Sequence, residues 1–294
     1  MMRRPGPLLQ WLAARREGTA PELPPGVQLN ADLPYGNDPA QVLDVYRPAG
    51  AATGAVLLLV HGGGWHRGDK AAGPVIGHKV AHWSARGWVV VSMGYRLWPM
   101  VSPSEQAADV ARAVAFVQRQ ASSWGADPAQ VAVFGHSAGG HLAALAAVDP
   151  LIAAAAQARP WAATVVVDSA ALDVPTLMAG PHLPMHAEVF GNDPAAWPVH
   201  SPLQRMTVAP SGALLLVCSR RRGDSVVAAQ AFAARVQGLG GRVQVLPLDL
   251  GHLQLNGELG RDPGYTAAVD AFLQAAAGVE RGNPRGHPGA RQLE

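Results

Sequence analysis

Apolar residues along this chain gather in short runs that are separated by segments of mixed polarity. Continuous apolar runs, such as 55–60 and 213–218, are typical of strands buried on both faces of a sheet. On this pattern we expect strands near 42–47, 55–60, 88–93, 131–134, 164–168, 213–218 and 242–248.

The intervening segments carry apolar residues at helical spacing, and we expect helices near 73–86, 104–121, 138–148, 225–238 and 264–277. Strands that alternate with helices form a mostly parallel sheet with helices on both faces. The pattern therefore predicts the α/β fold class. In such a sheet, functional residues gather where the strands reach their carboxyl ends.

The length and composition predict one large domain. A chain of 294 residues, 49% of them hydrophobic, can form a single α/β domain, which we place at 37–279. We expect residues 1–36 to form an N-terminal arm that can contribute to a cap, and residues 280–294, rich in Gly, Pro and Arg, to be a disordered tail. Residues 175–210 lack periodicity and are rich in proline, so they are either a cap insertion or a connecting excursion.

Charge and composition narrow the function classes. The net charge is only +2, and no basic face with interleaved aromatic residues suggests nucleic-acid binding. The N-terminal residues lack the apolar run of a signal peptide, and no apolar stretch is long enough for a membrane span, so we expect a cytoplasmic protein. The pattern gives no indication of the oligomeric state.

Neither a metal nor a cofactor is expected. The single cysteine, Cys218, excludes an intramolecular disulfide and suits small-residue packing in a strand. His78 and His82 have the i,i+4 spacing of a metal-binding pair, but no glutamate completes a zinc-protease motif. We interpret them as a pair on a helix surface.

The sequence Gly135-His136-Ser137-Ala138-Gly139-Gly140 carries the clearest chemical signal. It leaves an apolar strand and enters an apolar helix, and its G-x-S-x-G spacing is that of a nucleophile elbow. The turn is sharp, so glycines are needed where backbone segments crowd around the serine. We therefore expect Ser137 to be a nucleophile for acyl chemistry.

A second glycine-rich segment supports this interpretation. His61-Gly62-Gly63-Gly64-Trp65 follows the apolar run 55–60, and such a loop can supply backbone N–H donors to a tetrahedral oxyanion. The expected oxyanion hole consists of the N–H groups of Gly63, Gly64 and Ala138. We expect His61 and Trp65 mainly to support that loop.

Together with Gly94-Tyr95-Arg96-Leu97, these two motifs resemble the esterase/lipase branch of the α/β-hydrolases. Hormone-sensitive-lipase-like carboxylesterases and relatives of kynurenine formamidase belong to this branch. The resemblance runs from Leu43-Asp44-Val45-Tyr46-Arg47-Pro48 to His252 and beyond. It implies an α/β-hydrolase fold in which nucleophile, acid and base follow in the order Ser, Asp or Glu, His.

The resemblance implies His252 as the base, because the family places its histidine just past the last strand. It implies Asp224 as the acid, in the loop after the strand at 213–218. Asp249 is a fallback. Asp168, which ends an earlier strand, is a further alternative, because the acid has migrated to that position in some hydrolases.

Three arginines, Arg220, Arg221 and Arg222, depart from the family pattern before Asp224. They can be solvated, bind an acidic substrate group, or lower the pKa of the acid by proximity.

The expected reaction is hydrolysis of a small apolar or aryl ester through an acyl-enzyme, so the expected partner is a small-molecule ester. The alternative is an aryl formamidase that acts with the same residues on N-formylkynurenine-like substrates. A hydrolase fold that only binds a ligand is a third hypothesis, because fold does not determine function. The sequence does not identify the natural substrate.

Overall fold

The computed structural model describes residues 22–277, and its centre is an eight-stranded sheet. The strands are β1 (Gln28–Pro34), β2 (Val42–Arg47), β3 (Val56–Val60), β4 (Val89–Met93), β5 (Val131–His136), β6 (Ala163–Val167), β7 (Ala213–Ser219) and β8 (Val243–Leu248). All seven expected strands are confirmed, and β1 is an additional strand that the apolar pattern did not reveal.

The sheet is mostly parallel, with the order β1-β2-β4-β3-β5-β6-β7-β8. β2 pairs antiparallel with β1 and with β4, and the remaining neighbours pair parallel. Residues 22–36, the described part of the expected N-terminal arm, contain the edge strand β1, so the sheet begins before the expected boundary at 37. Residues 1–21 and the expected tail at 280–294 lie outside the described residues.

Helices follow most of the strands, and the five expected ones are confirmed as α2, α3, α4, α9 and α11. The helices are α2 (Gly73–Ser84), α3 (Pro103–Gln120), η1 (Ala121–Trp124), α4 (Ala138–Val148), α5 (Pro150–Ala155), α6 (Val174–Ala179), α7 (Pro184–Phe190), η2 (Trp197–His200), α8 (Pro202–Arg205), α9 (Gly223–Gly238), α10 (His252–Gly257) and α11 (Pro263–Ala277). Between residues 22 and 277, no helix is long and apolar enough to cross a bilayer.

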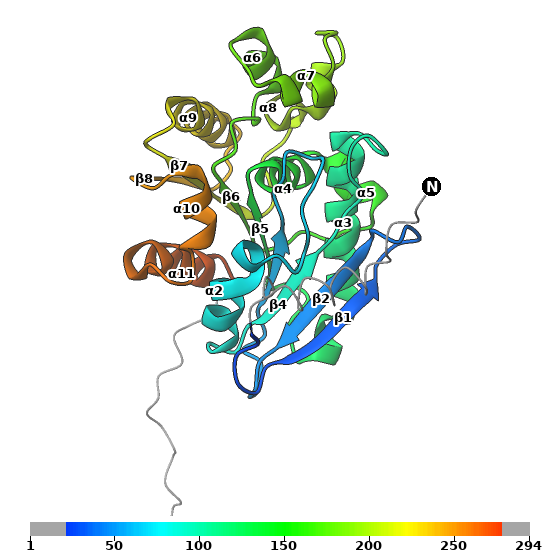
Figure 1. Cartoon of the computed structure of the whole chain (residues 1–294), viewed down its shortest axis with the longest axis vertical. Coiled ribbons are helices and arrows are strands. Elements are labelled where there is room, and N and C mark those ends of the chain that lie inside the picture. The colour runs from blue at the N-terminus through cyan, green and yellow to red at the C-terminus, as the bar shows by residue number, and fades with distance from the viewer. Residues whose placement is uncertain (1–21, 278–294) are drawn as a thin grey trace, which may run out of the picture.

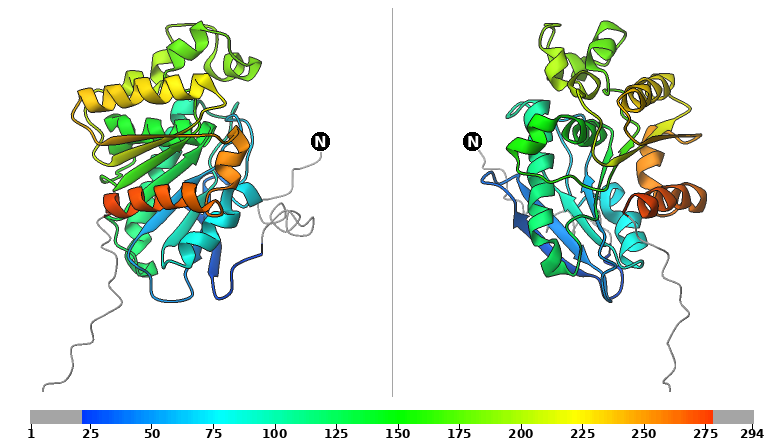
Figure 2. Two further views of the ribbon diagram at one scale, coloured as in Figure 1. Left: turned by 90° about the vertical axis from the view of Figure 1, so that its left-hand side faces the viewer. Right: turned by 180° about the vertical axis from the view of Figure 1, so that it is seen from behind.

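The helices cover both faces of the sheet, because alternate strand residues point to opposite sides. Leu57 and Leu59 of β3 pack with residues of α2 and α11, whereas Leu58 and Val60 pack with residues of α3 and α4. α9 extends the second layer over β7 and β8. Figure 2 shows these layers edge-on.

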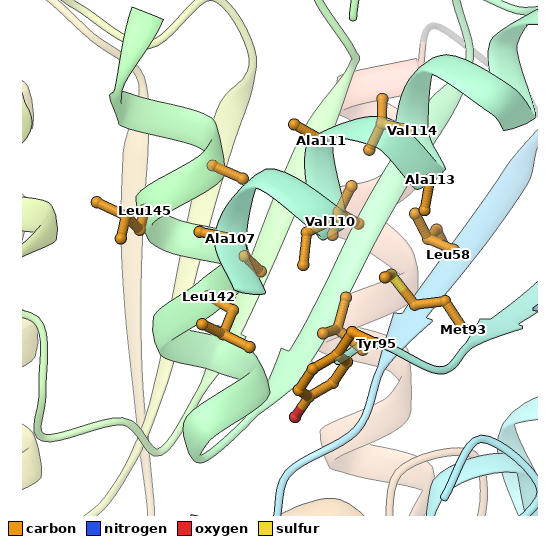
Figure 3. Close-up of a cluster of buried hydrophobic side chains, with 14 of the residues drawn as sticks. Leu58, Met93, Tyr95, Ala107, Val110, Ala111, Ala113, Val114, Leu142 and Leu145 are labelled. Carbon is orange, nitrogen blue, oxygen red and sulfur yellow. The ribbon is translucent and has the colours of Figure 1, made fainter. Parts of the chain in front are cut away.

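The core between α3, α4 and the sheet is built from small and medium apolar side chains. Figure 3 shows Val110 and Val114 of α3 and Leu142 of α4 beside Leu58 and Met93 of the sheet. All five side chains are fully buried. This packing holds α4, the helix that follows Ser137, against the centre of the sheet.

The segment between β6 and β7 forms a separate group of short helices. α6, α7 and α8 lie together at one end of the molecule (Figure 1). The sequence pattern did not predict them because each spans only one or two turns. Proline stands in the first turn of each helix, and the side chain of Asp173 caps α6.

A buried lysine connects α2 with α10, the helix that begins at His252. The ammonium of Lys79 donates to the backbone oxygen of Asn256 at 2.6 Å and to that of Pro74 at 2.9 Å. The Lys79 side chain is fully buried, and no carboxylate of the described residues is ion-paired with it. Burial lowers the pKa of Lys79 to about 7.

This lysine makes the stability of the fold depend on pH. In the unfolded chain the pKa of Lys79 returns to about 10.4, so between pH 7 and 10 the unfolded state binds more protons than the folded state. Folding stability therefore rises with pH in this window, by up to about 1.4 kcal/mol per pH unit. We expect Lys79→Met to remove this slope, as measured by urea denaturation at pH 7, 8 and 9. Arg86→Met, the loss of an exposed cation, should retain it.

Candidate active site

The site is built around a sharp turn between β5 and α4. Ser137 has φ 57° and ψ −122°, a left-handed conformation that is strained for a residue with a side chain. A Cβ atom at Gly135 would lie 2.2 Å from the backbone oxygen of Gly139, and one at Gly139 would lie 2.3 Å from that of Val60. Both positions therefore require glycine, as the G-x-S-x-G pattern predicted.

Ser137, His252 and Asp168 form a continuous chain of contacts. His252 Nε2 lies 3.0 Å from Ser137 Oγ, and His252 Nδ1 lies 2.6 Å from Asp168 Oδ2. The Asp168 side chain is fully buried, whereas that of His252 is one-third exposed. Because an ionised Asp168 can only accept, His252 Nδ1 carries the proton and Nε2 presents its lone pair to the serine.

Asp168 accepts hydrogen bonds from several groups at once. Its Oδ1 accepts from the backbone N–H of Ser219 at 3.0 Å and from the hydroxyl of Ser225 at 2.5 Å. Its Oδ2 accepts from His252 and, at 2.9 Å, from Arg222 Nη1. Burial raises the pKa of Asp168, but these donors outweigh it and hold the pKa well below its usual value. The carboxylate therefore stays ionised.

The expectation that Asp224 orients the histidine is contradicted by this geometry. Asp224 lies in the first turn of α9, its side chain is 55% exposed, and its contact is an ion pair with Arg222 Nη2 at 3.0 Å. Asp249, the fallback, is 73% exposed and pairs with Arg221 at 2.8 Å. The third alternative, Asp168, occupies the position beside His252.

The register of the sheet explains why Asp168 reaches the site. His136 of β5 pairs with Val167 of β6, so the next residues, Ser137 and Asp168, leave the sheet side by side. The N–H of Ser137 donates to the oxygen of Val167 at 2.8 Å. The signal in the sequence that could have identified the acid is that Asp168 directly follows the apolar run that ends at Val167, in the strand next to β5.

The three arginines before Asp224 have different partners. Arg220 donates to the backbone oxygen of Pro247, and Arg221 forms the exposed pair with Asp249. Arg222 lies in the site, where its Nη1 is 2.9 Å from both Asp168 Oδ2 and His252 Nδ1.

The expected oxyanion loop lies beside the serine. Gly63 and Gly64 have φ 133° and 61°, values that favour glycine. Within residues 22–277, the N–H groups of Gly63, Gly64 and Ala138 have no intramolecular acceptor. The Ala138 N–H is one of the free donors at the start of α4. Gly62 lies against the elbow, since a Cβ there would be 3.2 Å from Ser137 Cβ.

A buried tryptophan–histidine chain holds this loop in place. The indole N–H of Trp65 donates to His141 Nδ1 at 3.1 Å, and His141 Nε2 contacts the backbone oxygen of His200 at 2.7 Å. Because an indole only donates, His141 Nδ1 accepts and Nε2 carries the proton. Burial lowers the pKa of His141 to about 3, which keeps the ring neutral. The chain joins the glycine loop, α4 and η2.

Two further buried histidines frame the serine. His61 stacks on Tyr95 with ring centroids 4.3 Å apart, and the Tyr95 hydroxyl donates to the His61 backbone oxygen at 2.8 Å. His136 Nε2 contacts the backbone oxygen of His252 at 2.9 Å, and burial lowers the pKa of His136 to about 3. The side chains of both residues contact backbone oxygens, and that of His61 lies 2.9 Å from the oxygen of Gly62 in the glycine loop.

Two clefts open on either side of the serine. The first, of about 560 Å³, is lined by Ser137, Trp65, Leu177, Leu183, His186 and Arg222, among others. The second, of about 610 Å³, is lined by Ser137, Gly63, Gly64, Arg67, Val75 and Leu253, among others. Met185 of α7 lines both clefts, so the segment 174–205 borders the site.

The remaining residues that could bind a metal, His78, His82 and Cys218, lie apart from the serine site in other elements. His78 is exposed, and His82 pairs with Asp270 of α11 at 2.7 Å. Cys218 is buried in β7, and burial raises the pKa of its thiol to about 11. The described part of the chain contains no group of three or more His, Cys, Asp or Glu side chains that could hold a metal ion.

In comparisons of sequence, the N-terminal half of the chain matches a family model and is similar to proteins named as esterases. Residues 43–157 match the BD-FAE family model. Esterase LipC of Mycobacterium tuberculosis is 41% identical over 115 residues, which cover 38% of this chain and 28% of LipC. Isoprenylcysteine alpha-carbonyl methylesterase ICME of Arabidopsis thaliana is 32% identical over 42% of this chain and 28% of ICME. The chain thus matches under a third of the length of these relatives.

Solved structures extend the likeness to nearly the whole chain at the level of fold. Esterase B from Lactobacillus rhamnosis superposes with a TM-score of 0.69 at 21% identity, covering 92% of this chain and 93% of that one. Thermogutta terrifontis esterase 2, phosphonylated by sarin, gives a TM-score of 0.67 at 23% identity, covering 87% and 96%. The expected α/β-hydrolase fold is therefore confirmed.

Proposed function

We propose that this chain is a serine carboxylesterase of the esterase/lipase branch of the α/β-hydrolases and that it hydrolyses small esters. The observation that carries the proposal is the Ser137–His252–Asp168 chain, with contacts of 3.0 and 2.6 Å. A catalytic serine needs a base within hydrogen-bond reach and a third group that orients the base. The order Ser, Asp, His along the chain is that of the α/β-hydrolase fold.

In the proposed first step, Ser137 Oγ attacks the ester carbonyl while His252 Nε2 takes its proton. The imidazolium that forms is stabilised by Asp168, whose carboxylate lies against Nδ1. The negative oxygen is held by the N–H groups of Gly63, Gly64 and Ala138, which are free to donate. His252 then returns the proton to the departing alcohol, and an acyl-enzyme remains.

Water completes the reaction by the same route in reverse. His252 removes a proton from the water, the resulting hydroxide attacks the acyl carbonyl, and the proton passes back to Ser137. Burial keeps His136 and His141 neutral, and His252 is the histidine whose ring nitrogen contacts the Ser137 hydroxyl.

The clefts support substrates of limited size. Leu177, Leu183 and Met185 give the first cleft an apolar wall, and its volume of about 560 Å³ suits a small molecule. We propose that 174–205 acts as the cap over this cleft. The helices there are each one or two turns long, so they offer no amphipathic helix of the length of a lipase lid.

The nucleophile can be tested directly. Replacement of Ser137 by alanine removes the attacking oxygen and should lower kcat for p-nitrophenyl acetate by roughly 10⁶-fold. A fluorophosphonate should label the wild-type protein at Ser137 and leave the variant unlabelled, as read by peptide mass spectrometry. Labelling at another residue, or near-normal turnover by the variant, would disprove the assignment.

The acid is tested by isosteric amides. Asp168→Asn should favour the wrong tautomer of His252 and reduce kcat by about 10⁴-fold. Asp249→Asn, a change at an exposed carboxylate, should leave kcat unchanged, and Asp224→Asn should cost far less than Asp168→Asn. If Asp224→Asn instead proved the more damaging change, the acid would lie in the loop after β7.

The substrate class is tested with p-nitrophenyl esters from acetate to palmitate. We expect kcat/KM to rise with acyl length to between two and six carbons, because each buried CH₂ contributes up to about 0.8 kcal/mol, and then to fall as the cleft is filled. N-formylkynurenine serves as the comparison substrate. Faster turnover of the formamide than of every ester would favour a formamidase, and a maximum at long chains above their micelle threshold would indicate a lipase.

A further inference from the structure

The guanidinium of Arg222 contacts both members of the His252–Asp168 pair. Arg222 precedes α9, and its guanidinium bridges two carboxylates: Nη1 lies 2.9 Å from Asp168 Oδ2, and Nη2 lies 3.0 Å from Asp224 Oδ2. The same Nη1 lies 2.9 Å from His252 Nδ1. A fixed positive charge therefore stands beside the ring nitrogen that faces the acid.

The two neighbours of His252 Nδ1 place opposite demands on it. Asp168 requires a proton on Nδ1, whereas Arg222 could donate only to an unprotonated Nδ1. A ring nitrogen has one in-plane position, so it satisfies one of the two. With the proton on Nδ1, Asp168 is satisfied and Nε2 can accept from Ser137, but Arg222 then opposes any further positive charge on the ring.

Asp224 weakens the effect of the Arg222 charge on the histidine ring, because the two residues form an ion pair. It holds the far side of the guanidinium and is more than half exposed, whereas Arg222 is two-thirds buried. The negative charge of Asp224 therefore favours a positive charge on the His252 ring, whereas Arg222 opposes it. Solvent screens the more exposed charge of Asp224 more strongly. This arrangement gives Asp224 an electrostatic role without direct contact with His252.

Three other titratable residues lie near His252 or its helix, and each differs from Arg222 in its charge or its contacts. The ring of His136 of β5 lies against that of His252, tilted by 40° with the centroids 4.5 Å apart, and it is neutral because burial lowers the pKa of His136 to about 3. Lys79 of α2 reaches the same helix through Asn256. Tyr265 of α11 is buried, and burial raises its pKa far above the usual value.

Two more charged sets border the histidine. Arg221 and Asp249, in the loops after β7 and β8, neutralise each other at the surface. On the cap side, His182 and His186 of the segment 174–205 line the first cleft with Arg222 and Asp224. Arg222 is thus the fixed cation that contacts His252 directly, within residues 22–277.

We propose that Arg222, with Asp224 as its counter-ion, is a positioning residue that extends the activity of His252 to lower pH by opposing protonation of the ring. This inference rests on the proposed serine-esterase function. Loss of a cation next to a base makes the base easier to protonate, so the base is inactivated at a higher pH. Loss of Asp224 leaves Arg222 less neutralised and has the opposite sign.

The test is the acidic limb of the pH profile of kcat/KM for p-nitrophenyl acetate. Arg222→Met should move the midpoint of this limb upward by about one pH unit. Asp224→Asn should move it downward by a smaller amount, about half a unit, and about 1 M salt should shrink that shift. Arg222→Lys retains the charge and should restore most of the wild-type midpoint.

Arg221→Met and Asp249→Asn provide matched controls. Arg221 is next to Arg222 in the sequence, and each of these two changes breaks its exposed ion pair with Asp249. Both should leave the midpoint where it is in the wild type. Lys79 titrates alike in all of these proteins, so the comparison between variants cancels its contribution. Circular dichroism and thermal melting verify the fold of each variant.

Opposite shifts for Arg222→Met and Asp224→Asn would support the inference, because a merely structural role would lower kcat without moving the limb. An unmoved midpoint in both, or an equal shift in the Arg221 control, would overturn it. If Arg222→Met does not fold, the surface variant Asp224→Asn decides alone. A wild-type protein that neither hydrolyses the ester nor reacts with a fluorophosphonate would instead refute the proposed function.

Discussion

The close approach of backbone segments around Ser137 is the constraint on which the site depends. Glycine at 135 and 139 lets β5, α4 and the end of β3 meet with no room for a Cβ atom. This contact forces Ser137 into a left-handed conformation and places its hydroxyl just past the carboxyl end of the central strand β5. The same contact brings the glycine loop after β3 beside the N-terminus of α4, so nucleophile and N–H donors are positioned by one packing arrangement.

The second element of the site follows from strand pairing rather than from local sequence. Parallel pairing of β5 with β6 places Asp168 next to Ser137, and four donors then surround its carboxylate. An acid in the loop after β7 would have to displace Arg222 to reach His252. Because the arginine is anchored by Asp168 itself, the carboxylate at the end of β6 and the cation before α9 stabilise one another.

Local patterns were sufficient for the strands, the long helices, Ser137 and His252, because each leaves a signature in adjacent residues. They were insufficient for the acid. Asp168, Asp224 and Asp249 all lie at or shortly after the carboxyl ends of apolar runs, and the choice among them depends on which one the pairing of β5 with β6 places beside the histidine. The edge strand β1 was missed because its residues are half exposed and lack a continuous apolar run.

The position of Arg222 also bears on how this site balances charge. A deeply buried carboxylate beside a neutral histidine makes the ring more basic, which favours proton uptake but also favours the inactive protonated form at low pH. In the role proposed for Arg222, a cation shared between Asp168 and Asp224 opposes this effect while it supplies a fourth hydrogen bond to the acid. Arg222 therefore places a fixed positive charge beside the histidine–carboxylate pair, and Asp224, although it does not touch His252, partly neutralises that charge.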